Sequence, residues 1–304
     1  MLDVRRLRLL RELAHRGTIA AVAEALTYTP SAVSQQLTAL EREAGVPLLE
    51  RTGRSVALTP AARRLVAHTE TVLAVLAQAE AELVTGSAEL AGTLRIGAFP
   101  TAAHTLVAPA LVALSRDHPR LELLVTELDP ADTPAALRAE TLDLALVQEY
   151  DYVPPQPESG LDSDPLLEEV VYLAAPAATE VAAHRDSPWI AGTPGTLCQL
   201  LTVRACEAAG FTPRIRHHAD DFGTVLALVA AGQGVAFVPE LGAIAVPEPV
   251  TLTPLPIRRR TRLAYRRGTG THPAIAAART ALHAATGTSG YLSANRAHTG
   301  KVRM

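Results

Sequence analysis

The stretch from Ala61 to Thr85 contains neither proline nor glycine, and no other feature constrains the fold of this chain as much. Thr59 suits the N-cap of a helix and Pro60 its first turn, where the missing N–H of proline costs no hydrogen bond. The next helix breaker is Gly86, so one helix of about 40 Å is allowed at 1.5 Å per residue. We therefore expect residues 59–86 to form a linker helix between two domains.

The predicted linker helix carries an apolar stripe whose members are separated alternately by four and three residues. This spacing buries a seam by pairing with a second helix. Packing against the chain's own domain is the alternative, but a connecting helix has little of its own domain to lie on. The pattern favours a homodimer and leaves assembly into a tetramer open. The stripe consists of Leu58, Ala62, Leu65, Thr69, Val72, Leu76, Ala79 and Leu83.

Residues 1–58 contain three short helical patterns, each with one apolar face. The first ends near Gly17, the second begins at Thr18, and Thr29-Pro30 supplies an N-cap and a first turn for the third. A tight turn between the second and third helices predicts a helix-turn-helix. The apolar faces are Val4, Leu7, Leu10 and Leu13; Ile19, Val22, Ala23 and Leu26; and Val33, Leu37, Leu40 and Ala44.

The other face of the third helix carries short, uncharged side chains that form hydrogen bonds. Such side chains reach base edges when the N-terminus of a helix enters the major groove of DNA. The alternative is that some of them only cap the helix, as we expect of Thr29. The candidates for base contacts are Ser31, Ser34, Gln35 and Thr38.

Residues 48–58 predict two short strands around a turn at Gly53, which would form a wing. Arg51 and Arg54 near this turn suit phosphate or minor-groove contacts, which position a protein on DNA. Residues 1–64 carry ten arginines and six acids, a net charge of +4, although the whole chain carries −3. The basic N-terminal part is therefore the predicted nucleic-acid face.

At this point the sequence resembles a known family in detail. The N-terminal segments follow, in order, the signature of LysR-type transcriptional regulators. Two positions depart from the usual pattern: Leu49, where the family often has phenylalanine, and Ala62, where it often has glycine. Both changes conserve packing. The matching segments are Ala21 to Leu26, Ser31-Ala32-Val33-Ser34-Gln35-Gln36-Leu37, Leu40-Glu41, Gly45, Leu48-Leu49-Glu50-Arg51 and Leu58-Thr59-Pro60-Ala61.

The resemblance implies a sequence-specific DNA-binding regulator whose promoter binding responds to a small-molecule effector. It implies dimerisation through the linker helix and adds Pro30 to the base-facing candidates. It also implies an α/β fold overall, with an all-α winged helix-turn-helix and a C-terminal domain of two α/β lobes like a type 2 periplasmic binding protein. No cofactor is expected.

Strand and helix patterns alternate after about residue 92, as in parallel βα units. We expect an effector-binding domain over 92–286, with one lobe formed by about 92–160 and 266–286 and the other by about 161–265. Residues 287–304 are polar and without period, which predicts a disordered tail. The proline-rich residues 150–165 predict a crossover between lobes. The predicted strands are 94–97, 121–128, 142–147, 170–174, 189–190, 214–218, 235–238 and 261–266; the predicted helices are about 102–116, 197–209, 225–231 and 273–285.

In open α/β sheets the ligand crevice lies beyond the carboxyl ends of the strands. Helix N-termini at Thr101 and Thr196 would favour an anion, although both threonines are equally explained as N-caps. Glu149 would oppose an anion if it faced the cleft, so the charge of the effector stays open. The predicted effector contacts are Phe99, Pro100, Thr101, Gln148, Thr193, Thr196 and Phe237.

Other function classes find little support. No window has the 18 or more uncharged apolar residues of a membrane span, and the charged start does not resemble a signal peptide, so we expect a cytoplasmic protein. Gly232-Gln233-Gly234 is too short for a nucleotide fingerprint, and neither a nucleophile with a base nor a zinc spacing is found. A solute-binding or carrier module is the alternative for 92–286 alone.

Cys198 and Cys206 are the only cysteines, and redox sensing by them is one hypothesis. Eight residues along one helix separate them by about 12 Å, which is too far for a disulfide without rearrangement. This distance, and the position of Cys206 where a buried apolar residue is expected, argue against redox sensing but leave the question open. No metal site is expected, because no cluster of Cys and His has the spacing of one. The identity of the effector, the target genes and the sign of regulation are not encoded in any pattern of the sequence.

Overall fold

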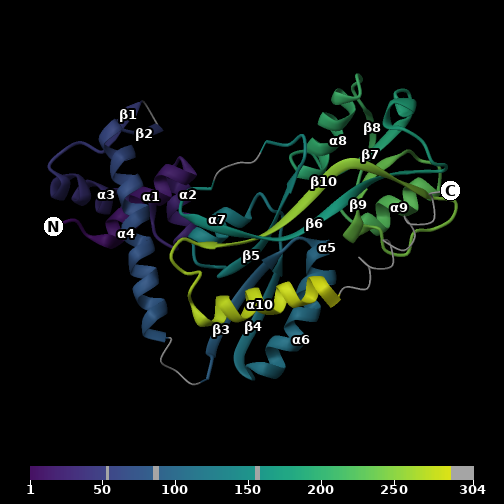
Figure 1. Ribbon diagram of the computed structural model, residues 1–304. Helices are drawn as coiled ribbons and strands as arrows, with labels where there is room; N and C mark the ends of the chain where they lie inside the picture. Colours follow the sequence, from purple (N-terminus) through teal and green to yellow (C-terminus); the bar gives the residue numbers. More distant parts are fainter. Residues whose placement is uncertain (53–54, 85–88, 155–157, 289–304) are drawn as a thin grey trace.

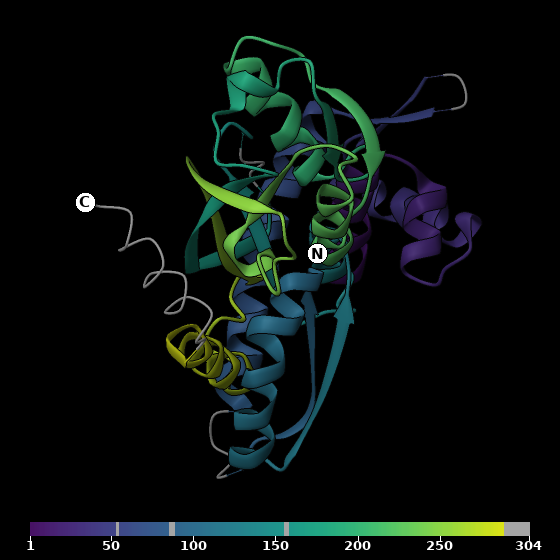
Figure 2. The same cartoon turned by 90° about the vertical axis from the view of Figure 1, so that its right-hand side faces the viewer.

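The computed structural model describes residues 1–52, 55–84, 89–154 and 158–288 (Figure 1). A small N-terminal domain and a larger C-terminal domain are joined by one long helix. In the view of Figure 2 the N-terminal domain projects to one side of the C-terminal domain.

The N-terminal domain packs three helices and a hairpin around one small core. The elements are α1 (Val4–Arg16), α2 (Ile19–Ala25), α3 (Pro30–Ala44), β1 (Leu49–Thr52) and β2 (Ser55–Leu58), the two strands pairing antiparallel. Each helix has a side-chain N-cap, and the one on α3 is Thr29, which accepts a hydrogen bond from Ala32 N at 3.2 Å. The helix-turn-helix predicted from the sequence is therefore present. Its core includes Leu10, Val22, Val33, Leu37 and Leu40, all less than 2% exposed.

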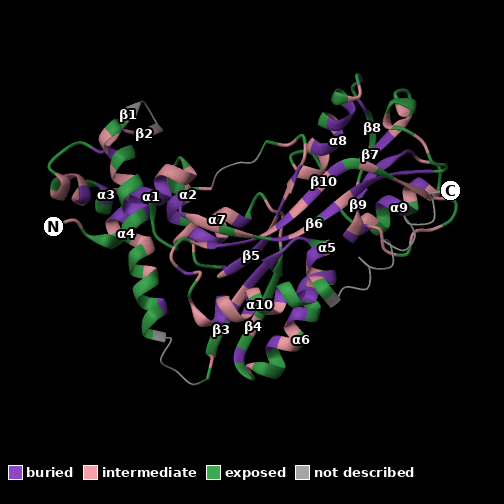
Figure 3. Ribbon diagram, viewed as in Figure 1, coloured by how far each residue is buried: buried purple, intermediate pink, exposed green. Residues whose placement is uncertain are grey.

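The linker helix α4 spans Pro60–Val84, and its apolar stripe divides into two halves. Thr59 caps the helix by accepting a hydrogen bond from Ala62 N. Near the start, Ala62 and Thr69 are buried within the chain itself, so the alternative of packing against the chain's own domain holds there. Farther along, Leu76 is 43% exposed and Leu83 84% exposed. Figure 3 shows this end of α4 largely exposed.

The C-terminal domain is built on a six-stranded sheet of order β4-β3-β5-β10-β6-β9. Strand β3 pairs parallel with β4 and β5, whereas β10 runs antiparallel to β5 and β6. In Figure 3, β5 and β9 are mostly buried, whereas β4 at the edge of the sheet is mostly exposed. Their bounds are β3 (Ala91–Ala98), β4 (Arg120–Glu127), β5 (Leu144–Tyr150), β6 (Leu161–Ala175), β9 (Ala236–Pro239) and β10 (Thr251–Arg266).

The first lobe is built on β3, β4 and β5. A continuous helical segment of α5, the π-helix η1 and α6 packs with α10 on one core, while α7 contributes to a second, smaller core that contains Leu137 and Leu142. Their bounds are α5 (Pro100–Ala102), η1 (Ala103–Val107), α6 (Ala108–Asp117), α7 (Thr133–Arg138) and α10 (Pro273–Thr288).

The second lobe contains the parallel pair β7–β8 beside β9. Trp189 is fully buried at its centre, with its ring centroid 5.0 Å from that of Phe237. Two longer helices and two 3₁₀ turns complete the lobe. The bounds are η2 (Val181–His184), β7 (Pro188–Ala191), α8 (Leu197–Ala208), β8 (Arg214–His218), α9 (Phe222–Ala230) and η3 (Glu240–Gly242).

Strands β6 and β10 are each ten residues longer than the sequence predicts, and both belong to the two lobes together. β6 begins at Leu161, inside the expected crossover, and β10 begins at Thr251, ten residues earlier than the predicted strand. Prolines hide both strands from sequence analysis because proline lacks the N–H that a ladder needs. The β6–β10 ladder accordingly shifts register near Pro254 and Pro165. The expected lobe boundaries near 160 and 265 fall at the ends of these shared strands.

The N-terminal domain also contacts the C-terminal domain directly. Arg11 Nη2 donates to the carbonyl oxygen of Arg138 at 3.1 Å, and Arg8 pairs with Glu140 at 2.7 Å. Arg11 is 5% exposed, so this contact is closed to solvent. The helix α1 thus joins the two domains independently of α4.

Two glycines let loops of the C-terminal domain approach α4 closely. Gly268 has φ 86° and lies against the carbonyl oxygen of Ala74, where a Cβ atom would collide with backbone. Gly160, with φ 76°, lies against the Glu70 carboxylate in the same way. A larger residue at either position would also meet the steric cost of a positive φ.

Candidate functional sites

The helix α3 presents a polar face that the rest of the domain leaves free. Gln35 and Thr38 are exposed and Ser34 is half-buried. None of the three has a hydrogen-bonding partner for its side chain among the described residues. The next residue differs, because Gln36 Oε1 accepts a hydrogen bond from Arg6 Nε at 2.9 Å. Free donors and acceptors on an exposed helix are available for base edges.

At the start of α3 the polar side chains are partly engaged. Thr29 caps the helix, and its hydroxyl lies 3.1 Å from that of Ser31. Pro30 and Ser31 are exposed. Of the two wing arginines, only the backbone of Arg51, on β1, is described by the structure. Arg54 lies outside the described residues. The DNA contacts expected of all these residues stay predictions.

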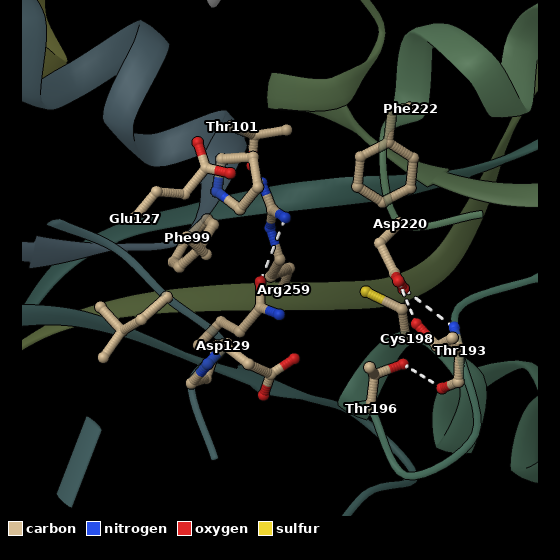
Figure 4. Close-up of a pocket in the computed structure, with 14 residues that line it drawn as sticks. Phe99, Thr101, Glu127, Asp129, Thr193, Thr196, Cys198, Asp220, Phe222 and Arg259 are labelled. Atoms are coloured by element: carbon tan, nitrogen blue, oxygen red, sulfur yellow. Dashed lines mark hydrogen bonds between the residues drawn. The ribbon is translucent and has the colours of Figure 1, made fainter. Parts of the chain in front are cut away.

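A cavity of about 450 Å³ opens between the two lobes of the C-terminal domain (Figure 4). It lies where strands β3, β4 and β8 end, as the topology of α/β sheets predicts. Figure 4 shows Phe99, Thr101 and Arg259 facing Cys198, Thr196 and Asp220 across it. The cavity is lined by Phe99, Pro100, Thr101, Glu127, Leu128, Asp129, Pro130, Gln148, Thr193, Thr196, Cys198, Asp220, Phe222 and Arg259.

The buried cation Arg259 organises the floor of this cavity. It is 1% exposed, and its Nε donates to Glu169 Oε1 at 2.7 Å. Its other nitrogens donate to Gln148 Oε1 and Thr101 Oγ1, both at 3.2 Å. Burial by itself lowers the pKa of Arg259, but the facing Glu169 carboxylate raises it above its ordinary value. Arg259 therefore stays charged and forms a buried ion pair with Glu169.

The wall from the second lobe is held by a loop before α8. Asp220 Oδ1 accepts a hydrogen bond from Thr193 N at 2.9 Å, and its other oxygen accepts one from the Thr193 hydroxyl. The Thr196 hydroxyl donates to Thr193 O at 2.9 Å and caps α8 by accepting from Gln199 N. Thr196 is thus an N-cap, which was one of the two roles expected for it.

Two known domain families match this chain. Residues 4–63 match the bacterial regulatory helix-turn-helix proteins of the lysR family, and residues 87–287 match the LysR substrate binding domain. The chain belongs to the LysR family. It is a transcriptional regulator with a DNA-binding helix-turn-helix domain and an effector-binding domain, as the resemblance in its N-terminal sequence implies.

Individual relatives agree with this assignment. The transcriptional dual regulator GltC of Bacillus subtilis is 28% identical over 79% of this chain and 81% of its own length. A probable hydrogen peroxide-inducible genes activator of Mycobacterium xenopi is 35% identical over 60% of this chain and 94% of its own length. Among solved structures, an OxyR mutant of Corynebacterium glutamicum with H₂O₂ bound covers 98% of this chain and 96% of its own, with 22% identity and a TM-score of 0.60. That likeness shows the shared LysR fold.

The structure brings most of the predicted effector contacts of this LysR-family chain to one cavity. Phe99, Pro100, Thr101, Gln148, Thr193 and Thr196 all line it, and their contact with an effector stays a prediction. Phe237 does not line it, because its ring packs against Trp189 in the core of the second lobe. Glu149 is also absent from the lining; it lies 3.7 Å from Arg262.

Sequence analysis missed five polar or aromatic residues of the cavity. Glu127 ends β4 and Asp129 follows it, and Asp220 and Phe222 follow β8. Both strands were predicted, so applying the strand-end rule to them would have found all four residues. Arg259 gives no such signal, because it lies within a run of three arginines on β10 that resembles a solvated strand.

The two cysteines have different surroundings in the structure. Cys198 lines the cavity, with its Sγ 3.5 Å from the Tyr150 hydroxyl, whereas Cys206 is fully buried in the second lobe. Burial raises the pKa of the Cys198 thiol, although Tyr150 and Arg259 partly oppose this. Burial raises the pKa of Cys206 to about 12. Both thiols are therefore protonated near neutral pH, and a thiol is a poor nucleophile.

The described part of the chain shows neither a membrane-spanning helix nor a metal-binding cluster. Within it, no helix combines the length and apolar character needed to cross a bilayer. No three His, Cys, Asp or Glu side chains of these residues are grouped to hold a metal ion.

Proposed function

We propose that this LysR-family regulator reads a dyad-symmetric operator with α3 and alters its DNA binding when a small molecule occupies the cavity between its lobes. The observation that carries the DNA-reading part is the free polar face of α3, on which Gln35 has no partner within the described residues. Two such faces in a two-fold dimer would meet two half-sites one helical turn apart, or a multiple of it.

A homodimer is supported by the exposed end of α4. Val72, Leu76 and Leu83 are 40–84% exposed and share the stripe that the sequence predicts for helix pairing. Burial of such side chains against a second copy removes apolar surface from water. Assembly of dimers into a tetramer is compatible with this arrangement. Arg51 and Arg54 are proposed to hold phosphates beside each half-site.

The regulatory part rests on the shape of the C-terminal domain. Because β6 and β10 run through both lobes, a ligand that contacts both walls of the cavity would favour one angle between them. We propose no catalytic step for this cavity, and the wholly non-enzymatic role agrees with the regulators to which the chain is related. Since it acts on bacterial DNA, we expect it in the cytoplasm.

A footprint of the purified chain on the DNA upstream of its own gene tests this proposal. We expect two protected half-sites related by a dyad, with their centres separated by about 10 base pairs or a multiple of that distance. Protection without symmetry, or no preference over random DNA at physiological salt, would contradict the dimeric reading of an operator.

A further inference from the structure

Three carboxylates line the cavity between the lobes, and their charge is not balanced there. Glu127 and Asp129 come from the first lobe and Asp220 from the second (Figure 4). Glu127 is exposed and has neither an ion pair nor a side-chain hydrogen bond with a described residue. Asp129 accepts one hydrogen bond, from Ala131 N at 2.8 Å, and Asp220 is bonded only to uncharged groups of Thr193.

The single cationic side chain that the structure describes in the lining does not offset these charges. Arg259 forms its ion pair with Glu169, whose side chain is fully buried behind the cavity. Arg259 also lies over the ring of Phe99, 5.0 Å from its centroid. Counted together, the pair is neutral, and the lining keeps a formal charge of −3 from Glu127, Asp129 and Asp220.

Two of the donors that could hold an anion in the second lobe are already engaged. At the start of α8, Gln199 N donates to the Thr196 hydroxyl, and Thr193 N donates to Asp220. An anion placed there would also face the exposed Asp220 carboxylate, and like charges repel each other. The helix end therefore does not favour an anionic ligand.

Asp129 and Asp220 lie on opposite walls of the cavity, and the Cys198 thiol lies near both carboxylates. Figure 4 shows Cys198 on the side of Asp220, with the Asp129 carboxylate directed toward it from the first lobe. Both carboxylates contribute to raising the pKa of the Cys198 thiol, after burial as the larger cause. The half-buried Phe222 also lines the cavity on this side, and aromatic rings attract cations.

We propose that the effector carries a protonated amine, which Asp129 and Asp220 hold between the two lobes. The single positive charge of the ammonium group attracts both carboxylates and offsets their mutual repulsion across the cavity, and so stabilises the closed arrangement of the lobes. This proposal rests on the proposed function of the cavity as the effector site. The ammonium chemistry is shared by diamines and by zwitterionic amino acids.

Three probes share a five-carbon chain and differ only in the charged groups at its ends: 1,5-diaminopentane, 5-aminopentanoate and glutarate. Titration calorimetry on the full chain should show at least one of the two amines binding about tenfold more tightly than glutarate, a difference that shrinks with added salt. Tighter binding of the diamine identifies a diamine-like effector, and tighter binding of the aminopentanoate a zwitterion. Tighter binding of glutarate, or no heat from either amine up to about 10 mM, would overturn the proposal.

Variants test whether the preference for amines over glutarate arises from Asp129 and Asp220. The double variant Asp129→Asn, Asp220→Asn should abolish the tenfold difference, because asparagine keeps the hydrogen bond from Thr193 N but not the charge. Glu149→Gln removes a carboxylate of the first lobe outside the cavity and should leave the difference unchanged. Equal loss in both variants would contradict a local role of the two aspartates.

A bulky substitution separates this proposal from the proposed function. Thr196→Trp fills the cavity and should abolish the response of promoter binding to an extract of the host cell. If it does so while the amines fail to bind, the cavity is the effector site and the ligand class proposed here is wrong. If Thr196→Trp keeps the full response, the cavity is not the effector site and the proposed function fails as well.

Discussion

The proposed DNA-reading face of α3 and the cavity between the lobes are both polar, but their side chains are used in opposite ways. On α3, Gln35 and Thr38 are exposed and have no side-chain partner among the described residues. In the cavity, Arg259 is bonded to Glu169, Gln148 and Thr101. A reading surface keeps its hydrogen-bonding groups free for bases, whereas a binding cavity uses many of its own groups to hold its walls in place.

This difference predicts which changes affect folding. A substitution on the free face of α3 should alter DNA binding with little effect on stability, since exposed side chains without partners contribute little to it. A substitution of the buried cavity groups should alter stability first. The experiments below test that separation, beginning with the largest expected effect.

Arg259→Leu should destabilise the C-terminal domain by about 3–5 kcal/mol, because it leaves the buried Glu169 carboxylate without its partner. The free energy of unfolding from urea titration measures this. Replacing both members of the pair, as in Arg259→Leu with Glu169→Leu, should recover part of the loss. A cost below about 1 kcal/mol for the single change would mean that the pair is solvated and that the cavity floor is not built on it.

Gly268→Ala should destabilise the chain by about 2–4 kcal/mol, since the new Cβ meets the carbonyl oxygen of Ala74 at a positive φ. The matched control is Gly232→Ala, which has a similar φ of 69° and open space around it, and should cost only about 1–2 kcal/mol. Both are measured by thermal unfolding. Equal costs would show that the close approach of this loop to α4 contributes no packing energy and does not link the two regions.

Glu12→Gln should destabilise the N-terminal domain by about 1–3 kcal/mol near neutral pH. Burial raises the pKa of Glu12, but ion pairs with Arg11 and Arg16 outweigh it and hold the pKa below 4.5. A lowered pKa stabilises the fold above the unfolded value, and the benefit is lost as pH falls through the folded value. The difference between wild type and variant should therefore shrink below about pH 4.5. A difference that does not change with pH would contradict the ion pairs.

The smallest expected effect is at the cysteines. Because burial raises the pKa of both thiols, the native chain should react with iodoacetamide or H₂O₂ near neutral pH far more slowly than the urea-unfolded chain. Mass spectrometry of the modified peptides follows this. Rapid oxidation of Cys198 in the native chain would show that the cavity activates its thiol. That result would support redox sensing by Cys198.

The two regions also differ in how far the sequence predicts them. The helix-turn-helix follows from local signals: Thr29 and Pro30 begin α3, and a 3.6-residue period separates Val33, Leu37 and Leu40 from the free face. The N-cap and the apolar period that mark α3 lie within the helix and the residue before it. Prediction therefore succeeds where neighbouring residues decide the structure.

The cavity depends on residues that are distant in the sequence. Arg259 and Glu169 are 90 positions apart, and nothing near Arg259 shows that it is buried. Phe237 was expected in the cavity because it ends a strand, but the pattern cannot show that its ring turns toward Trp189. Strand ends locate such a site, whereas the direction of each side chain depends on tertiary packing.

The ratio of operator to random-DNA affinity, measured by fluorescence anisotropy at several salt concentrations, tests the central claim most directly. Gln35→Ala should lower this ratio by about 1–3 kcal/mol of discrimination while the salt dependence and the unfolding free energy stay as in wild type. The matched control is Gln36→Ala, which removes the neighbouring glutamine. Because the Gln36 side chain is already bonded to Arg6, this change should leave the ratio unchanged. Equal losses on operator and random DNA for Gln35→Ala would contradict a base-reading role for α3.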